Sequence, residues 1–239
     1  MRLHDFRVLS FDCYGTLIDW ESGLFAALGP LLARLPAPPE RDGVLAAFAR
    51  HESAQEAETP SLRYSDLLGR VHRRLAAEWG IGPDEKAEQR FGASVPDWPA
   101  FPDSAEALTY LKQHYQLVIL SNVDRKSFAA SNRRLGVSFD AIFTAEDIGS
   151  YKPDPANFRY LIAHLAERGV KKEDILHTAQ SLYHDHVPAQ RAGLATSWID
   201  RRHGAVGFGA SLKPPEGVRY DVRFPSLAAM AEAHRAEAG

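Results

Sequence analysis

The sequence predicts an α/β protein in which a parallel sheet carries a helical segment inserted after its first strand. Short apolar runs that suit buried strands alternate with helical stretches along most of the chain. This alternation is typical of parallel sheets joined by crossover helices. The interval between the first two apolar runs is much longer than one crossover helix requires, and its patterns are helical.

Five apolar runs are the expected strands, and they lie at residues 7–11, 116–120, 141–144, 175–179 and 195–199. Within the long interval, helices are expected near residues 23–35, 43–57 and 65–79. Proline and glycine at residues 36–39 and 80–83 break the helical pattern there. The proline-rich residues 96–102 mark the expected return to the sheet.

Composition excludes several classes of protein. The 239 residues have 28 basic and 31 acidic side chains, and no dense basic run of the kind that binds a phosphate backbone, so nucleic acid is not an expected partner. Cys13 is the single cysteine and cannot form an intramolecular disulfide. The first residues are too polar for a signal peptide, and no apolar run reaches the roughly 20 residues of a membrane span. We therefore expect a cytoplasmic protein that does not contact a membrane.

Polar side chains follow the expected strands, at the edge where open parallel sheets form their catalytic crevice. They are Asp12, Ser121, Asn122, Lys152, Gln180, Ser181 and Asp185. A carboxylate such as Asp12 can act as a nucleophile if a cation keeps it ionised, and Lys152 is the candidate cation. Thr16, Ser121 and Asn122 offer short donors that could hold a carboxylate or an anionic substrate. Each residue alone could instead be a cap, a turn or a solvated charge, but their joint order favours a site.

Four ordered motifs show that the chain resembles the haloacid dehalogenase superfamily. They lie at residues 12–17 (Asp-Cys-Tyr-Gly-Thr-Leu), 120–122 (Leu-Ser-Asn), 152–155 (Lys-Pro-Asp-Pro) and 180–185 (Gln-Ser-Leu-Tyr-His-Asp). The resemblance implies a Rossmann-like core formed by residues 1–17 and 101–239. It also implies a helical cap formed by residues 18–100, with the active site between the two.

The motifs also indicate a branch of this superfamily. Most members that resemble the pattern are magnesium-dependent phosphatases with Asp-x-Asp in the first motif, where this chain has Tyr14. In the fourth motif, Asp185 matches the second residue of an acidic pair, whereas neutral Ser181 or Gln180 stands at the first. The sequence Asp-x-Tyr-Gly-Thr instead resembles the 2-haloacid dehalogenase branch. This resemblance implies that neither a metal nor another cofactor is needed.

By the same resemblance, Asp12 displaces halide from a short 2-haloalkanoate and forms an aspartyl ester. Water then hydrolyses the ester and releases a 2-hydroxyacid. Lys152 is expected to position Asp12, and Asp185 is the expected general base, directly or through Lys152. The expected ligand is therefore a small halocarboxylate.

The resemblance assigns further residues to substrate binding. Ser121 and Asn122 match positions expected to contact the substrate carboxylate, with Thr16 and Ser181 as further polar contacts. Tyr14 fills the space of the missing acid, and Trp20 is expected to wall the halide pocket. The cap should also supply an arginine near the halide. Arg50 is the expected residue, Arg63 is its rival, and a solvated helix position is the other interpretation of Arg50.

Two departures from better-known dehalogenases leave the substrate open. Phe158 stands where they have tyrosine, and Gln180-Ser181-Leu182 replaces Ser-Ser-Asn. Two alternative functions also stay open, namely a magnesium-dependent phosphatase acting on a small phosphate ester and a non-catalytic binding protein with the same fold. The resemblance makes a homodimer reasonable.

Overall fold

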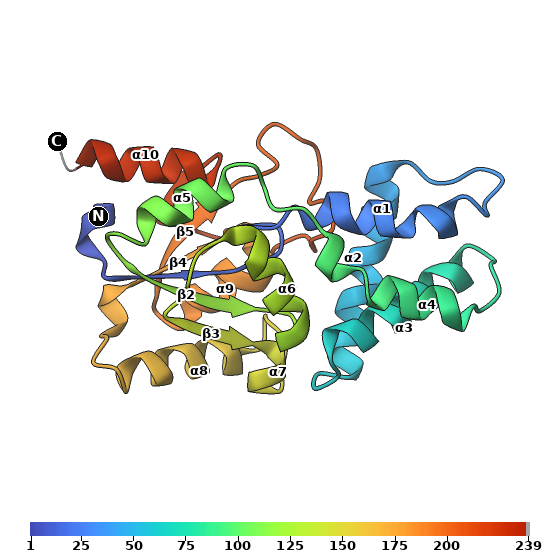
Figure 1. Cartoon of the computed structure of the whole chain (residues 1–239), viewed down its shortest axis with the longest axis horizontal. Coiled ribbons are helices and arrows are strands. Elements are labelled where there is room, and N and C mark those ends of the chain that lie inside the picture. The colour runs from blue at the N-terminus through green and yellow to red at the C-terminus, as the bar shows by residue number, and fades with distance from the viewer. Residues whose placement is uncertain (238–239) are drawn as a thin grey trace.

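The computed structural model describes residues 1–237 and is built around one six-stranded parallel sheet (Figure 1). The strands are β1 (Val8–Phe11), β2 (Gln116–Ser121), β3 (Ala141–Thr144), β4 (Ile175–Ala179), β5 (Ala195–Ile199) and β6 (Val222–Phe224). Their order is β3-β2-β1-β4-β5-β6, and every neighbouring pair is parallel. The predicted α/β fold with a Rossmann-like parallel sheet is confirmed. Strand β6 was not predicted, because its three residues are not a buried apolar run.

The central strands read as continuous apolar runs because both of their faces are buried. Side chains alternate across the sheet, so Leu9 and Phe11 of β1 join one hydrophobic cluster and Val8 joins the other. The helices that surround the sheet are α5 (Ser104–Leu111), α6 (Arg125–Leu135), α7 (Ala145–Ile148), α8 (Pro155–Ala166), α9 (Val187–Arg191) and α10 (Leu227–Glu237). Helices α5 and α10 contact each other over the face of the sheet to which Leu9 points, and α8 covers the opposite face, to which Val8 points (Figure 1).

The residues between β1 and α5 form the helices α1 (Trp20–Leu32), α2 (Arg41–Glu58), α3 (Tyr64–Glu78) and α4 (Glu85–Gly92). They gather beyond the arrowheads of β2 and β3, on the side where the strands end (Figure 1). The first three helices agree with the predicted ones. Helix α4 was missed because its eight residues are mostly polar. Ile18 forms an isolated bridge with Ala100, so the chain leaves and re-enters the sheet region at one place. The cap boundaries at residues 18 and 100 stay a prediction.

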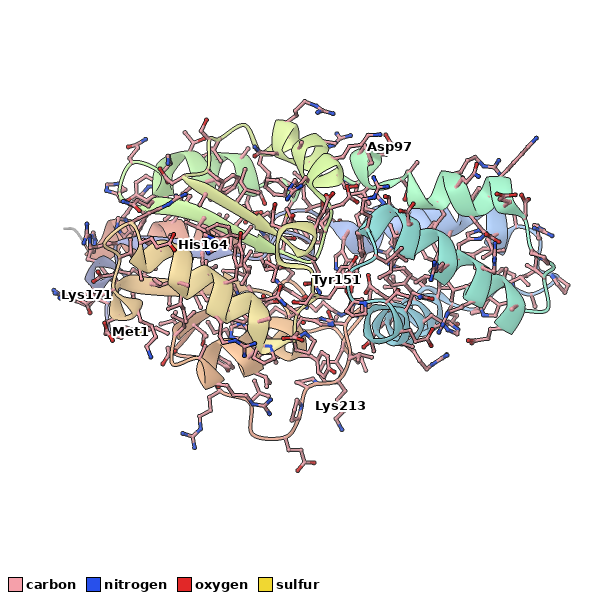
Figure 2. All side chains as sticks on the ribbon, turned by 90° about the horizontal axis from the view of Figure 1, so that it is seen from below. Met1, Asp97, Tyr151, His164, Lys171 and Lys213 are labelled. Atoms are coloured by element: carbon pink, nitrogen blue, oxygen red, sulfur yellow. The ribbon has the colours of Figure 1, made fainter. Side chains whose placement is uncertain are left out.

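Side chains tie the helical segment to the sheet. Figure 2 labels Tyr151, which lies between the two regions, and its hydroxyl donates to the carbonyl oxygen of Leu62. Arg201 donates to the carbonyl oxygen of Thr16 at 2.9 Å and pairs with Asp103 at 2.8 Å. The contact of Arg201 with Thr16 holds the loop that follows β1. None of the helices in residues 1–237 is both long and apolar enough to span a bilayer.

Two glycines of α1 provide a test of how tightly this helix packs. A Cβ on Gly23 would lie 2.4 Å from the indole ring of Trp98, which is 1% exposed, whereas a Cβ on Gly29 would meet no atom within 4 Å. Gly23→Ala should therefore lower the free energy of unfolding by about 1–3 kcal/mol through overpacking. Gly29→Ala should raise it by about 0.5–1 kcal/mol, because alanine favours a helix over glycine. Urea titrations of both variants measure these changes, and a stabilising Gly23→Ala would contradict the described packing.

Candidate active site

Asp12 lies at the carboxyl edge of the sheet, directly after β1, and is 6% exposed. Its Oδ1 accepts a hydrogen bond from Nζ of Lys152 at 2.9 Å, and its Oδ2 accepts one from the hydroxyl of Thr16 at 2.8 Å. The same hydroxyl accepts the backbone N–H of Gln180 at 2.9 Å, which fixes its direction. Thr16 therefore holds the carboxylate of Asp12, and its side chain does not line the adjacent cavity, so its contact with substrate stays a prediction.

The ammonium of Lys152 is buried among acceptors, with the residue 1% exposed. It donates to Asp12, to Oδ1 of Asp185 at 2.6 Å and to the carbonyl oxygen of Leu120 at 3.0 Å. These three acceptors use all three protons of an ammonium. Burial alone would lower the pKa of Lys152, but the charges of Asp12 and Asp185 outweigh it and raise that pKa. Lys152 is therefore a fixed cation at the edge of the sheet.

Asn122 holds the backbone of Lys152 in place. Its side-chain oxygen accepts the N–H of Lys152 at 2.7 Å, and its amide nitrogen donates to the carbonyl oxygen of Lys152 at 2.9 Å. The same nitrogen donates to Oε1 of Glu56 at 3.2 Å. The side chain was predicted to contact substrate, but most of its hydrogen-bonding capacity is used within the protein.

Asp185 lies in a π-helical turn, Leu182–His186, that follows β4. Its Oδ1 also interacts with Nε2 of His177 at 2.9 Å, and Nδ1 of His177 lies 2.8 Å from the hydroxyl of Ser10. Burial alone would raise the pKa of Asp185, but Lys152 and His177 hold it well below the usual range. A carboxylate with so low a pKa is a weak base. These contacts favour a role for Asp185 in holding Lys152.

A small cavity of about 40 Å³ lies next to Asp12, where the helical segment meets the sheet. It is lined by Asp12, Tyr14, Trp20, Glu52, Glu56, Tyr64, Ser121, Asn122, Lys152, Ser181, His184, Asp185 and Ser211. Apart from Thr16, Arg50 and Gln180, all of the predicted site residues line it. The hydroxyl of Tyr14 lies 3.0 Å from that of Ser131, and Oγ of Ser181 accepts the backbone N–H of His184 at 3.1 Å. Trp20 forms one wall and packs edge-on against Phe48.

The structure corrects the expected position of Arg50. Its side chain is 59% exposed and donates to both carboxylate oxygens of Glu78, at 3.0 and 3.2 Å, on the outside of α2 and α3. Its rival Arg63 is 66% exposed and lies 3.6 Å from Asp66. Neither lines the cavity, and the described lining contains no other arginine.

Sequence reasoning missed five lining residues, which are Glu52, Glu56, Tyr64, His184 and Ser211. Glu52 and Glu56 face the cavity from α2, where an arginine was expected. Burial raises the pKa of Glu52 to about 8 and that of Glu56 well above the usual range, with the neighbouring Glu52 adding to the second shift. Burial lowers the pKa of His184 to about 4, so this imidazole is neutral near pH 7.

The residues present do not fit a magnesium site. Mg²⁺ is usually held by carboxylate oxygens and water in octahedral geometry. Here Oδ1 and Oδ2 of Asp12 already receive Lys152 and Thr16, and Oδ1 of Asp185 already receives Lys152 and His177. Within residues 1–237 no cluster of three or more His, Cys, Asp or Glu side chains is arranged to hold a metal ion.

A parallel sheet with a buried carboxylate and lysine at its carboxyl edge defines an α/β enzyme. The chain belongs to the haloacid dehalogenase-like hydrolase family, whose model matches residues 6–178. It is 25% identical over 204 residues to (S)-2-haloacid dehalogenase 4A of Burkholderia cepacia, and the match covers 82% of this chain and 84% of that protein.

Two solved structures share the fold. The L-2-haloacid dehalogenase of Xanthobacter autotrophicus, solved with chloropropionic acid covalently bound, has a TM-score of 0.77 and 18% identity, covering 96% of this chain and 98% of that one. A HAD-hydrolase of Bacillus subtilis, YfnB, solved with magnesium, has a TM-score of 0.75 and 20% identity, covering 98% and 100%. Because both identities are low, these likenesses establish the fold, and the substrate must be argued from the site.

The raised pKa of Glu52 predicts a pH-dependent change in stability. In the unfolded chain Glu52 ionises near pH 4.5, whereas the folded protein keeps its proton up to about pH 8. Between these values the folded state binds the additional proton, so the contribution of Glu52 to stability falls as the pH rises. Glu52→Gln removes this loss and should be more stable than the unchanged protein at pH 8, by about 1–4 kcal/mol.

Thermal or urea unfolding at several pH values from 4 to 8 measures the effect. The difference between Glu52→Gln and the unchanged protein should shrink toward pH 4. Glu58→Gln, on the exposed side of the same helix, is the matched control and should change stability by less than about 1 kcal/mol. A difference for Glu52→Gln that does not vary with pH would show that Glu52 is ionised in the folded protein.

Proposed function

We propose that this enzyme hydrolyses the carbon–halogen bond of a small 2-haloalkanoic acid through an ester on Asp12, without a metal. The observation that carries the proposal is the carboxylate of Asp12, held between Lys152 and Thr16 beside a small cavity. The 25% identity to an (S)-2-haloacid dehalogenase supports the substrate class. The cavity of about 40 Å³ suits only a small molecule.

In the first step, one carboxylate oxygen of Asp12 attacks the carbon that bears the halogen. The carbon–oxygen bond forms as the carbon–halogen bond breaks, and halide leaves with the bonding electrons. No proton is required by a halide leaving group, so the replacement of an acid by Tyr14 removes nothing that this step needs. Lys152 and Thr16 aim the carboxylate, which places the reacting atoms in a fixed geometry.

In the second step, water attacks the carbonyl carbon of the ester, and the bond between that carbon and the ester oxygen breaks. One proton of the water passes to the departing oxygen, which gives the 2-hydroxyacid, and the other passes to the medium, so that Asp12 is restored as a carboxylate. Lys152, still held by Asp185 and Leu120, stabilises the negative charge that develops on the ester oxygen. In this proposal Asp185 keeps Lys152 in place and orients the water from the cavity wall.

The hydroxyl of Ser121 is a side-chain donor available to the substrate carboxylate. The residue is 2% exposed and lines the cavity, and its oxygen has no hydrogen-bond partner within residues 1–237. A buried hydroxyl without a partner is unfavourable, so a ligand oxygen there would be stabilising.

The direct test is halide release from chloroacetate and 2-chloropropionate in the presence of EDTA. We expect turnover in the unchanged enzyme and a loss of about 10³-fold or more in Asp12→Asn, because a neutral amide is a poor nucleophile. Single turnover in ¹⁸O-labelled water should place the label in the carboxylate of Asp12. No halide from any of several chloro-, bromo- and fluoroacids would refute this activity.

Arg50→Ala is the matched control for a cationic site on the helical segment. Since Arg50 contacts Glu78 on the surface, this variant should keep the halide-release rate of the unchanged enzyme within about twofold. A large loss of rate in Arg50→Ala would mean that α2 reorients during turnover.

A further inference from the structure

Two buried acids, Glu52 and Glu56, form a part of the cavity that the proposed reaction does not use. They stand one helical turn apart on α2 and are 5% and 7% exposed. The hydroxyl of Tyr64 donates to Oε1 of Glu52 at 2.6 Å, and the amide of Asn122 donates to Oε1 of Glu56 at 3.2 Å. Within residues 1–237 neither acid has a lysine, arginine or histidine within salt-bridge distance. Lys152 is near enough to lower the pKa of Glu56, but its ion pairs are with Asp12 and Asp185.

The protons of Lys152 are not available to this acid pair, because they are directed to Asp12, Asp185 and Leu120. A buried carboxylate without a cation is costly, and burial accordingly raises the pKa of both acids. A second cation brought into the cavity would reverse this penalty. A halide or a carboxylate at the same place would increase it.

Aromatic side chains complete the surroundings of the acid pair. Tyr14, Trp20 and Tyr64 line the same cavity, and the rings of Tyr14 and Tyr64 are stacked with centroids 6.5 Å apart. The faces of tyrosine and tryptophan attract ammonium groups, and aromatic walls combined with carboxylates are a recurrent way of binding them. The walls and the acids thus favour the same kind of ligand.

An independent feature indicates that a ligand enters here. The buried hydroxyl of Ser121 has no partner within the described chain and lies on the wall of the same cavity. It can donate to a carboxylate, whereas the acid pair can accept from an ammonium. A molecule with both groups would satisfy both sites.

From this juxtaposition we propose that Glu52 and Glu56 bind an ammonium group of the substrate, so that the enzyme acts on a small carboxylic acid that also carries an amine. The proposal rests on the proposed function for the carbon that Asp12 attacks. It adds no chemical step, because the ammonium is bound and stays on the substrate. One acid of the pair ionises as the cation binds, and its proton passes to the solvent.

The test compares two unreactive ligands of equal size, β-alanine and butanoate, which differ by an ammonium in place of a methyl group. Isothermal titration at pH 8 gives the dissociation constants. We expect β-alanine to bind the unchanged enzyme about tenfold or more tightly than butanoate, as one good cation contact would provide. Equal binding, or tighter binding of butanoate, would overturn the proposal.

The variants Glu52→Gln and Glu56→Gln test whether these acids create the preference. Each should weaken β-alanine about tenfold or more while leaving butanoate binding unchanged or improved, which also shows that the cavity is intact. Glu58→Gln, whose side chain is on the outer face of α2 and pairs with Arg74, should behave like the unchanged enzyme. A preference that survives in both cavity variants would contradict the assignment.

The two proposals fail separately. Because the titrations need no turnover, a preference for β-alanine without halide release would refute the haloacid reaction and support the ammonium site. Halide release from 2-chloropropionate together with a preference for butanoate would support the reaction and refute the ammonium site.

Discussion

The buried ammonium of Lys152 is the interaction on which the site depends. It joins Asp12 after β1, Leu120 in β2 and Asp185 after β4, so one side chain links the carboxyl ends of three neighbouring strands. Removing a lysine from water is unfavourable by several kcal/mol unless its protons are matched, and here each proton has an acceptor. Asn122 fixes the backbone from which this side chain extends. The sheet edge is therefore rigid where the carboxylate must be aimed.

Because all three protons of the Lys152 ammonium are already donated, Lys152 has little capacity to bind a ligand. With its protons directed to Asp12, Asp185 and Leu120, it cannot also bind an incoming carboxylate or a departing halide without releasing a partner. The polarity that a ligand meets is then set by the other side chains of the cavity, which come from the sheet edge and from the inserted helices. In the proposed reaction the sheet and its lysine direct the attack, and Glu52, Glu56 and Tyr64 contribute to the choice of ligand.

The sequence was most informative for the strands, because burial determines both their apolar composition and their place in the sheet. Strands buried on both faces must be apolar runs, so β3, β4 and β5 were predicted with their observed bounds. The short, polar α4 and β6 give no such signal. The prediction that Arg50 lines the cavity was wrong because it rested on the position of Arg50 along the chain and not on the side of the helix that this position faces. Residues 45, 48, 49, 52 and 56 share the buried face of α2, and position 50 lies off it. Acids on an otherwise apolar face were the signal for Glu52 and Glu56.

Charge explains why the relatives do not fix the substrate of this enzyme. Asp12 and Asp185 place two carboxylates at the site, and Lys152 pairs with both, while His177 also contacts Asp185. A haloalkanoate adds a further carboxylate, and no arginine lines the cavity to compensate it. Protonated Glu52 and Glu56 leave that imbalance, whereas an ammonium group on the substrate offsets the added carboxylate and gives the buried acid pair a cation at short range. At 25% identity the relative leaves the substrate open, and the lining of the cavity must decide it.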